Sequence, residues 1–206
     1  MPLLRKWNIN ENAVAAIWLA DEPEAYFAEQ TGLQPPISHE KRRTEHLAGR
    51  FLLKLLKNDF PLHDIKIDEH GKPHLAGDDV HFSVSHSWPY IAAVIDNGRS
   101  AGIDVQTWTE KIVRIKHKFL SEGEQELLGH DPRNFLAAWS AKETAYKWHG
   151  KDGTEFIEEL PIIEFPEKKY LKILFNLNGF QQILHIRVDF EPDFVCTYLE
   201  KVEMEH

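Results

Sequence analysis

The sequence predicts an α+β fold made of two similar halves, residues 1–100 and 101–206. The order of elements predicts it, because helical patterns and groups of short strands follow one another as helix, strands, helix pair and strands. Composition is consistent with two halves but does not require them, since 206 residues with 42% hydrophobic side chains can fill one large core or two small ones. The repeated order therefore favours two halves.

The first half is predicted to hold one helix and then a strand meander. Residues 38–57 fit the helix, with Ser38 as its N-cap and leucine and phenylalanine at four-residue spacing. Residues 65–75 are expected to form short extended pieces around a turn. Residues 82–86 alternate between apolar and polar side chains, and the apolar run at residues 90–95 is the expected hairpin partner.

The second half is predicted to begin with another strand. Residues 101–106 alternate, so Ile103 and Val105 share one face while Asp104 and Gln106 share the other. Strands are also expected at residues 170–177, 181–188 and 194–198, with a hairpin turn at Asn178-Gly179 between the first two. Cys196 falls in the last of these strands and is expected to be buried there.

Two helices are predicted between these strands. Ser121 is followed three residues later by Glu124, which is the pattern of a capping box, and Gly129 with Pro132 ends that helix. A longer helix is expected over residues 133–149 and is closed by Gly150.

Composition and charge exclude several classes of protein. A net charge of −9 argues against a surface that binds nucleic acid as a whole, so an anionic ligand requires a local basic site. No apolar stretch approaches the roughly 20 residues that cross a bilayer. The first ten residues lack the apolar segment of a secretory signal, and a cytoplasmic location is expected. One cysteine cannot form an internal disulfide.

The predicted helix over residues 133–149 carries an unusual stripe. Three- and four-residue spacing aligns Trp139, Lys142, Glu143, Tyr146 and Lys147. The wall of a cleft would accommodate aromatic and charged side chains together. A partly buried helix stabilised by a Glu143–Lys147 pair explains the stripe as well, and the helix taken alone favours that simpler interpretation.

A carboxylate on the strand at residues 101–106 could meet this helix. Acidic residues are depleted from strands, yet Asp104 stands between two apolar neighbours. If Asp104 and Glu143 converge, they offer the oxygen ligands that Mg²⁺ prefers. An aspartate at a sheet edge or in a turn is an equally good explanation of Asp104. His86, between Ser85 and Ser87, could bind phosphate oxygens, although a lone histidine is usually structural.

Five short blocks together resemble one family. In chain order they are Gly71-Lys72-Pro73, residues 82–87, residues 102–105, residues 119–124, and Trp139-x-x-Lys142-Glu143-x-x-x-Lys147. Zinc spacing, a glycine-rich phosphate loop and a nucleophile elbow do not occur. The blocks, in this order and spacing, resemble the Sfp-type 4′-phosphopantetheinyl transferases over about residues 43–147.

The resemblance implies a reaction and a metal site. The two halves would be related by a pseudo-twofold axis, with coenzyme A in the crevice between them and its phosphopantetheine arm passing to a carrier-protein serine. Asp104 and Glu143 resemble the Mg²⁺ ligands, and Gln106 stands where the family often has a glutamate. Lys142 and Lys147 would add positive charge. Either Glu124 or Glu143 would help to deprotonate the serine.

The resemblance also implies binding residues and a partner. The coenzyme A contacts it implies are Arg43, Arg50, Lys72, Pro73, Ser85, His86, Ser87 and Lys147. The partner is an apo acyl or peptidyl carrier protein, which is acidic around its serine, so the basic residues Arg114, Lys116 and Lys118 are the expected docking surface. No nucleic acid or membrane partner is expected. The protein is expected to be a monomer. The alternatives are a non-catalytic coenzyme A module and a Mg²⁺-dependent phosphohydrolase.

Overall fold

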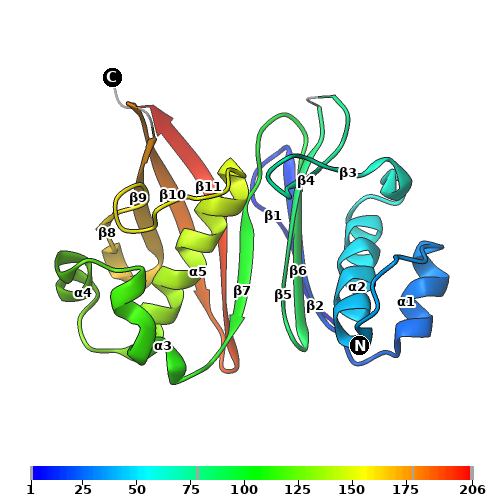
Figure 1. The fold of residues 1–206 in the computed structure, drawn as a ribbon, viewed down its shortest axis with the longest axis horizontal. Helices are drawn as coiled ribbons and strands as arrows, with labels where there is room; N and C mark the ends of the chain where they lie inside the picture. The colour runs from blue at the N-terminus through cyan, green and yellow to red at the C-terminus, as the bar shows by residue number, and fades with distance from the viewer. Residues whose placement is uncertain (1, 78, 178, 205–206) are drawn as a thin grey trace. The chain divides into compact units, whose positions relative to one another are not determined.

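The structure, a computed structural model, describes residues 2–77, 79–177 and 179–204. The chain divides into two compact units, Met1–Ala101 and Gly102–His206, and each has its own cluster of buried apolar side chains. Both combine helices with antiparallel strands, as Figure 1 shows, so the predicted α+β class is confirmed. The pseudo-twofold relation of the halves stays a prediction.

The first unit is a four-stranded sheet with its helices stacked on one face (Figure 1). The order of strands is β1-β2-β6-β5; α2 packs on β6 and β2, and α1 packs on α2. Its elements are β1 (Leu3–Asn8), β2 (Ala13–Leu19), α1 (Glu24–Thr31), α2 (Glu40–Leu56), the 3-10 turn Leu62–Asp64, β3 (Lys66–Ile67), β4 (Pro73–His74), β5 (His81–Ser87) and β6 (Tyr90–Asp96). The predicted hairpin of residues 82–86 and 90–95 is confirmed by the β5–β6 pairing.

The hairpin β1–β2 and helix α1 were missed by the sequence analysis. Strand β2 lies between β1 and β6, and most of its residues are buried. Its sequence, AVAAIWL, is a continuous apolar run of the kind expected for a strand that is covered on both faces. That run was sufficient to predict the strand.

The predicted start of α2 was wrong by one residue. The N-cap is His39, whose ring nitrogen Nδ1 accepts from the backbone N–H of Arg42, and not Ser38. The carbonyl of Ser38 instead accepts from the Arg43 side chain, 3.2 Å away. A side chain of the first helical turn thus bonds to the residue that was predicted to be the cap.

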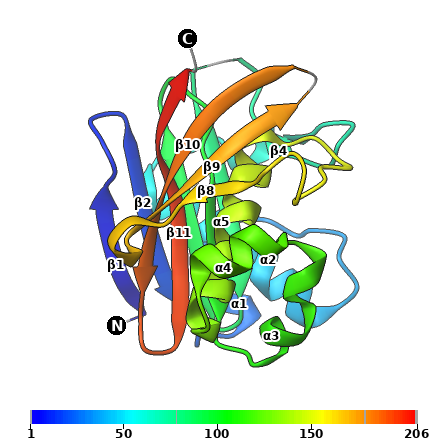
Figure 2. The ribbon, with the colours of Figure 1, turned by 90° about the vertical axis from the view of Figure 1, so that its left-hand side faces the viewer.

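The second unit is a five-stranded sheet crossed by one long helix. The order of strands is β7-β11-β10-β9-β8, and α5 packs mainly on β11 and β7 (Figure 2). Its elements are β7 (Ile103–Thr107), α3 (Lys111–Ile115), the 3-10 turn Lys116–Lys118, α4 (Glu122–Leu128), α5 (Pro132–His149), β8 (Ile162–Glu164), the 3-10 turn Pro166–Lys168, β9 (Tyr170–Leu177), β10 (Phe180–Phe190) and β11 (Phe194–Met204).

Most local predictions for this unit are confirmed. Ser121 and Glu124 form both hydrogen bonds of the capping box at the start of α4. Gly150 ends α5 in the left-handed conformation, at φ 81°. Strands β9 and β10 pair antiparallel, and Cys196 is fully buried in β11. The predicted turn residue Asn178 lies outside the described residues. Of the helices described, each is too short or too polar to cross a membrane.

Candidate functional site

A glycine lets α5 approach β7 closely. A Cβ atom built on Gly102 would lie 2.3 Å from the backbone carbonyl oxygen of Thr144, closer than real Cβ contacts occur. Only a residue without a side chain therefore fits between the start of β7 and the last turns of α5. This close packing sets Asp104, two residues further along β7, against the side chains of α5.

Asp104 is almost completely buried, with 1% of its surface exposed, and three donors surround its carboxylate. Lys147 Nζ donates to Oδ1 at 2.5 Å, while Ser140 Oγ and Gln106 Nε2 each donate to Oδ2 at 2.9 Å. Burial of a carboxylate is costly without such partners. Asp104 therefore lies on the edge strand of the sheet, as one interpretation predicted, but it is a buried member of a polar cluster.

Glu143 lies close enough to this cluster for its proton affinity to depend on it. Burial and, to a smaller extent, the charge of Asp104 raise the pKa of Glu143 to about 7, and Lys147 partly opposes this rise. A raised pKa means that the ionised form is short of stabilising positive charge. The structure therefore brings together three predicted residues, Asp104, Glu143 and Lys147, in an arrangement that favours an added cation.

The donor set fits magnesium better than a metal that needs many protein ligands. Within the described ranges, histidine, cysteine, aspartate and glutamate side chains form no group of three or more that could hold an ion. Two carboxylates with the amide of Gln106 nearby leave positions for water and phosphate oxygens, which Mg²⁺ commonly retains. Asp104 and Glu143, with Gln106, are the residues that would hold it.

Lys142 and Glu124 face a different part of the unit. Lys142 is fully buried, and its Nζ donates to Glu124 Oε1 at 2.6 Å and to the carbonyls of Phe119 and Phe156 at 2.8 and 2.7 Å. Burial lowers the pKa of Lys142, and the charge of Glu124 opposes that effect. The backbone N–H groups of Ile162 and Ser121 donate to Glu124. This pair joins α4, α5 and the segment that leads to β8.

The stripe predicted on α5 thus divides into two faces. Lys147 bonds to Asp104 and the charge of Asp104 acts on Glu143, whereas Trp139 packs on Phe119 and Phe156, with ring centroids 5.1 and 5.6 Å apart. The aromatic side chains belong to the edge of the apolar core. Neither interpretation of the stripe was complete, since it combines core packing with one side of a charged cluster.

The first unit has a cavity of about 500 Å³ that contains part of the predicted binding set. The residues that line it are Ile37, Arg42, Glu45, His46, Arg50, Pro73, Val84 and His86. Burial lowers the pKa of Arg50 to about 10. Burial, followed by the charges of Arg50 and His86, lowers the pKa of His46 to about 4. The cavity is a basic hollow in which Glu45 faces His86 at 3.5 Å.

His46 and Glu45 were not singled out in the sequence analysis. His46 lies one helical turn from Arg42 and from Arg50, so four-residue spacing alone aligned the three side chains on α2. The sequence could not indicate that this face of α2 would meet Pro73 and His86 around one cavity.

The other predicted binding residues of this unit lie elsewhere. Arg43 is held by Glu24, 2.7 Å away, and by the carbonyls of Ile37 and Ser38. Lys72 lines a smaller cavity of about 130 Å³ together with Pro73, and burial lowers its pKa. Ser85 is buried in β5, and Ser87 is paired with Tyr90 at the end of the β5–β6 hairpin.

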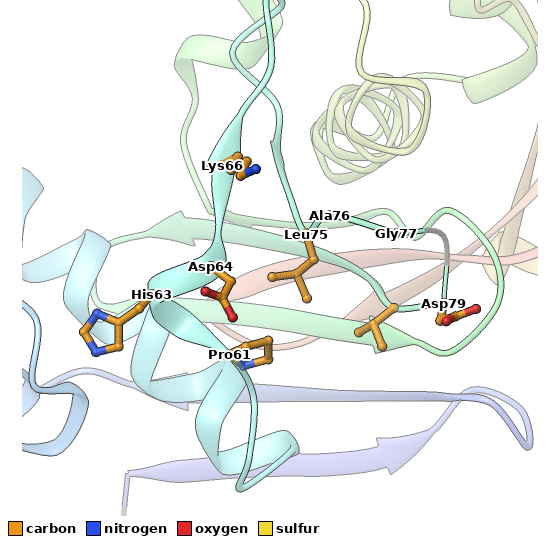
Figure 3. A pocket seen from close by; sticks show the side chains of 9 residues that line it. Pro61, His63, Asp64, Lys66, Leu75, Ala76, Gly77 and Asp79 are labelled. Atoms are coloured by element: carbon orange, nitrogen blue, oxygen red, sulfur yellow. The ribbon is translucent and has the colours of Figure 1, made fainter.

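A further cavity of about 480 Å³ contains none of the predicted residues (Figure 3). Pro61, His63, Asp64 and Lys66 come from the segment after α2, and the remaining lining residues follow β4. Asp64 and Asp79 lie well apart in the close-up, so the two carboxylates do not converge on one ion.

The predicted docking residues follow β7 in the second unit. Arg114 lies on α3 and Lys118 at the end of the next 3-10 turn, and both are exposed. Lys116 is partly buried, with its Nζ 4.3 Å from the centre of the Phe135 ring. The segment also exposes Val113, so it presents exposed cations beside an apolar side chain.

Comparison with known proteins supports the predicted resemblance. Residues 100–199 match the family model of the 4′-phosphopantetheinyl transferase superfamily. The 4′-phosphopantetheinyl transferase gsp of Aneurinibacillus migulanus is 31% identical over 114 residues, which are 52% of this chain and 46% of that protein. A 4′-phosphopantetheinyl transferase of Bacillus subtilis is 33% identical over 91 residues, 41% of this chain and 40% of that protein. The chain spans less than half the length of either relative.

Proposed function

We propose that this chain is a 4′-phosphopantetheinyl transferase, because its resemblance to that superfamily is confirmed. It transfers the 4′-phosphopantetheine arm of coenzyme A to a serine of an apo carrier protein and releases adenosine 3′,5′-bisphosphate. The observation that carries the proposal is the coupling of Asp104, Glu143 and Lys147 within residues 100–199, the part that matches the family model.

The carboxylates of this cluster would bind Mg²⁺. Once bound, the ion would neutralise the diphosphate of coenzyme A and polarise the phosphorus that is attacked. Lys147, which is 24% exposed and bonded to Asp104, would donate to a phosphate oxygen on the same side. The close packing of β7 and α5 at Gly102 would set the positions of Asp104 and Glu143.

Glu143, rather than Glu124, is the better candidate for the base that accepts the serine proton. A general base works best when its pKa lies near the operating pH, and without the ion burial and the charge of Asp104 raise the pKa of Glu143 to about 7. The two oxygens of Glu124 already accept from Lys142, Ile162 N–H and Ser121 N–H. A serine hydroxyl would have to displace one of these buried donors to reach Glu124.

The cavity of the first unit would bind the phosphate-bearing nucleotide end of coenzyme A. Arg42, Arg50 and His86 line it and are suitable donors to phosphate oxygens. Arg43 is a weaker candidate than its position in the motif implied, because its guanidinium is bonded to Glu24 and to two backbone carbonyls. Lys72 and Pro73 would contribute from the neighbouring smaller cavity.

The acidic carrier would dock at Arg114 and Lys118. Both cations are exposed, whereas Lys116 is engaged with Phe135. Charge reversal of Arg114 and Lys118 should raise the KM for the carrier and reduce its dependence on salt, while the KM for coenzyme A stays constant. Reversal of Lys169, an exposed cation of the same unit outside this segment, is the matched control. Equal effects of both reversals would exclude docking at this segment.

The transferase activity is tested with the full chain, coenzyme A, Mg²⁺ and a panel of apo carrier proteins. Mass spectrometry should detect the mass gain of one phosphopantetheine arm on a carrier. Asp104→Ala and Glu143→Ala should abolish the gain, and Gln106→Glu should retain it. Binding of coenzyme A without any mass gain would favour the non-catalytic module. Breakdown of coenzyme A without a carrier would favour the phosphohydrolase, and full turnover by both alanine variants would overturn the metal assignment.

A further inference from the structure

A chain of three buried hydroxyl groups ends at the carboxylate of Asp104. Ser140 and Thr144 lie one turn apart on α5, and Thr197 is the residue of β11 that pairs with Asp104 across the sheet. Ser140 Oγ lies 2.9 Å from Asp104 Oδ2 and 2.9 Å from Thr197 Oγ1. Thr144 Oγ1 lies 2.7 Å from Thr197 Oγ1 and 3.2 Å from the carbonyl of Thr197. All three side chains are fully buried.

Proton counting fixes the direction of this chain. An ionised carboxylate can only accept, so the single hydroxyl hydrogen of Ser140 points at Asp104. Ser140 then has only its lone pairs for Thr197, so Thr197 must donate to Ser140. By the same argument Thr144 donates to Thr197, and its one hydrogen is shared between the hydroxyl at 2.7 Å and the carbonyl at 3.2 Å. The three O–H dipoles therefore all point toward Asp104, and each strengthens the next.

The location of these hydroxyl groups argues for a role beyond packing. They stand among fully buried apolar residues, including Ala141, Ala145 and Val195. Alanine and valine would fill similar volumes there without the cost of burying polar atoms. The chain also ends at a carboxylate of the candidate metal site, whereas a purely structural hydroxyl of a helix commonly bonds to a carbonyl of its own helix, as Thr31 does with Phe27.

The arrangement gives the two oxygens of Asp104 different surroundings. Oδ2 accepts from two neutral donors, Ser140 and Gln106, and Oδ1 accepts from the cation Lys147. Rotation of the carboxylate about its Cβ–Cγ bond would break the Ser140 bond inside the core. The hydroxyl chain thus fixes the plane of the carboxylate and turns one of its oxygens toward the charged side of the cluster.

We propose that Ser140 and Thr197 are positioning residues that hold the Asp104 carboxylate in the orientation that binds the divalent cation. This proposal rests on the proposed function, because it assigns these residues a task in the same metal site. Partners of metal ligands in other proteins change metal affinity by about 10- to 100-fold when they are removed. An effect of this size is expected here for Ser140, and a smaller one for Thr197, which acts through Ser140.

The test measures metal binding without turnover. Mn²⁺ is titrated into the full chain, and the free ion is followed by electron paramagnetic resonance. Relative to the unsubstituted chain, Ser140→Ala should raise the Kd about 10- to 100-fold. The near-isosteric Ser140→Cys, a weaker donor, should give an intermediate Kd and guards against misfolding of the alanine variant. Thr197→Val should raise the Kd less than Ser140→Ala, and Thr31→Val is the matched buried-threonine control that should leave it unchanged.

A double variant separates positioning from general loosening of the core. Because Thr197 acts through Ser140, Thr197→Val should have little further effect on the Kd once Ser140→Ala is present. Effects of the two substitutions that multiply, or a Kd unchanged by Ser140→Ala, would overturn the proposal. If the unsubstituted chain transfers the phosphopantetheine arm but the Ser140 variants all have its Kd for Mn²⁺, the positioning role is refuted and the proposed function stands. If that chain neither binds Mn²⁺ nor modifies any carrier, both fail.

Discussion

The buried pair Lys142–Glu124 gives the sharpest test of how the second unit is built. The two side chains are 0% and 4% exposed, so removal of one charge leaves the other stranded in the core. Loss of one member of such a pair costs about 3 to 5 kcal/mol. Lys142→Met and Glu124→Leu should therefore each lower the free energy of unfolding by about that amount.

The double variant should lose much less free energy of unfolding than the sum of the two single losses. It leaves no buried charge without a partner, but it removes the side-chain partners of four backbone groups. These are the groups of Phe119, Phe156, Ile162 and Ser121. At about 1 kcal/mol each, these losses amount to ~4 kcal/mol. The double variant should thus be about as stable as either single variant, whereas additive effects would give a loss of roughly 6 to 10 kcal/mol.

The assay combines urea unfolding, followed by circular dichroism, with transfer rates measured where each variant is folded. The double variant should keep most of its kcat if Glu124 only supports the structure. Glu143→Gln, which leaves the buried pair intact, is the matched variant and should lose turnover without loss of stability. Additive losses of stability would refute the coupling of the pair. A folded double variant without turnover would refute the assignment of Glu143 as the base.

Two further predictions concern pH and packing. The pKa of His46, about 4 in the folded chain, lies below the 6.5 of an exposed histidine, so the unfolded chain binds the extra proton between these values. The free energy of unfolding should therefore fall by roughly 1 to 2 kcal/mol as the pH drops from 6.5 to 4, a range that allows for solvent screening of the half-buried ring. His46→Asn should reduce this pH dependence, as measured by urea titrations at several pH values. Gly102→Ala, which sets a Cβ against the Thr144 carbonyl, should lower the melting temperature, whereas Gly123→Ala in α4, with open space around it, should raise or maintain it. A more stable Gly102→Ala protein would contradict the close packing of β7 and α5.

Local patterns in the sequence were sufficient for much of the fold. The capping box of Ser121, the closure of α5 at Gly150 and the alternation in β5 each depend on residues within a few positions of one another. Such short-range preferences act before any tertiary contact forms. The candidate cluster was partly accessible in the same way, because the spacing on α5 aligned Glu143 with Lys147.

What a given face contacts was decided only by the tertiary structure. Neighbouring residues on a helix point about 100° apart, so Lys142 and Glu143 face different partners although they were predicted to serve one site. Lys142 is neutralised by Glu124, and Glu143 faces Asp104. The sequence by itself determined which side chains can share a face. The packing of α5 on α4 and on β7 decided which carboxylate is already saturated with donors and which one needs a cation, because that depends on atoms brought together from distant parts of the chain.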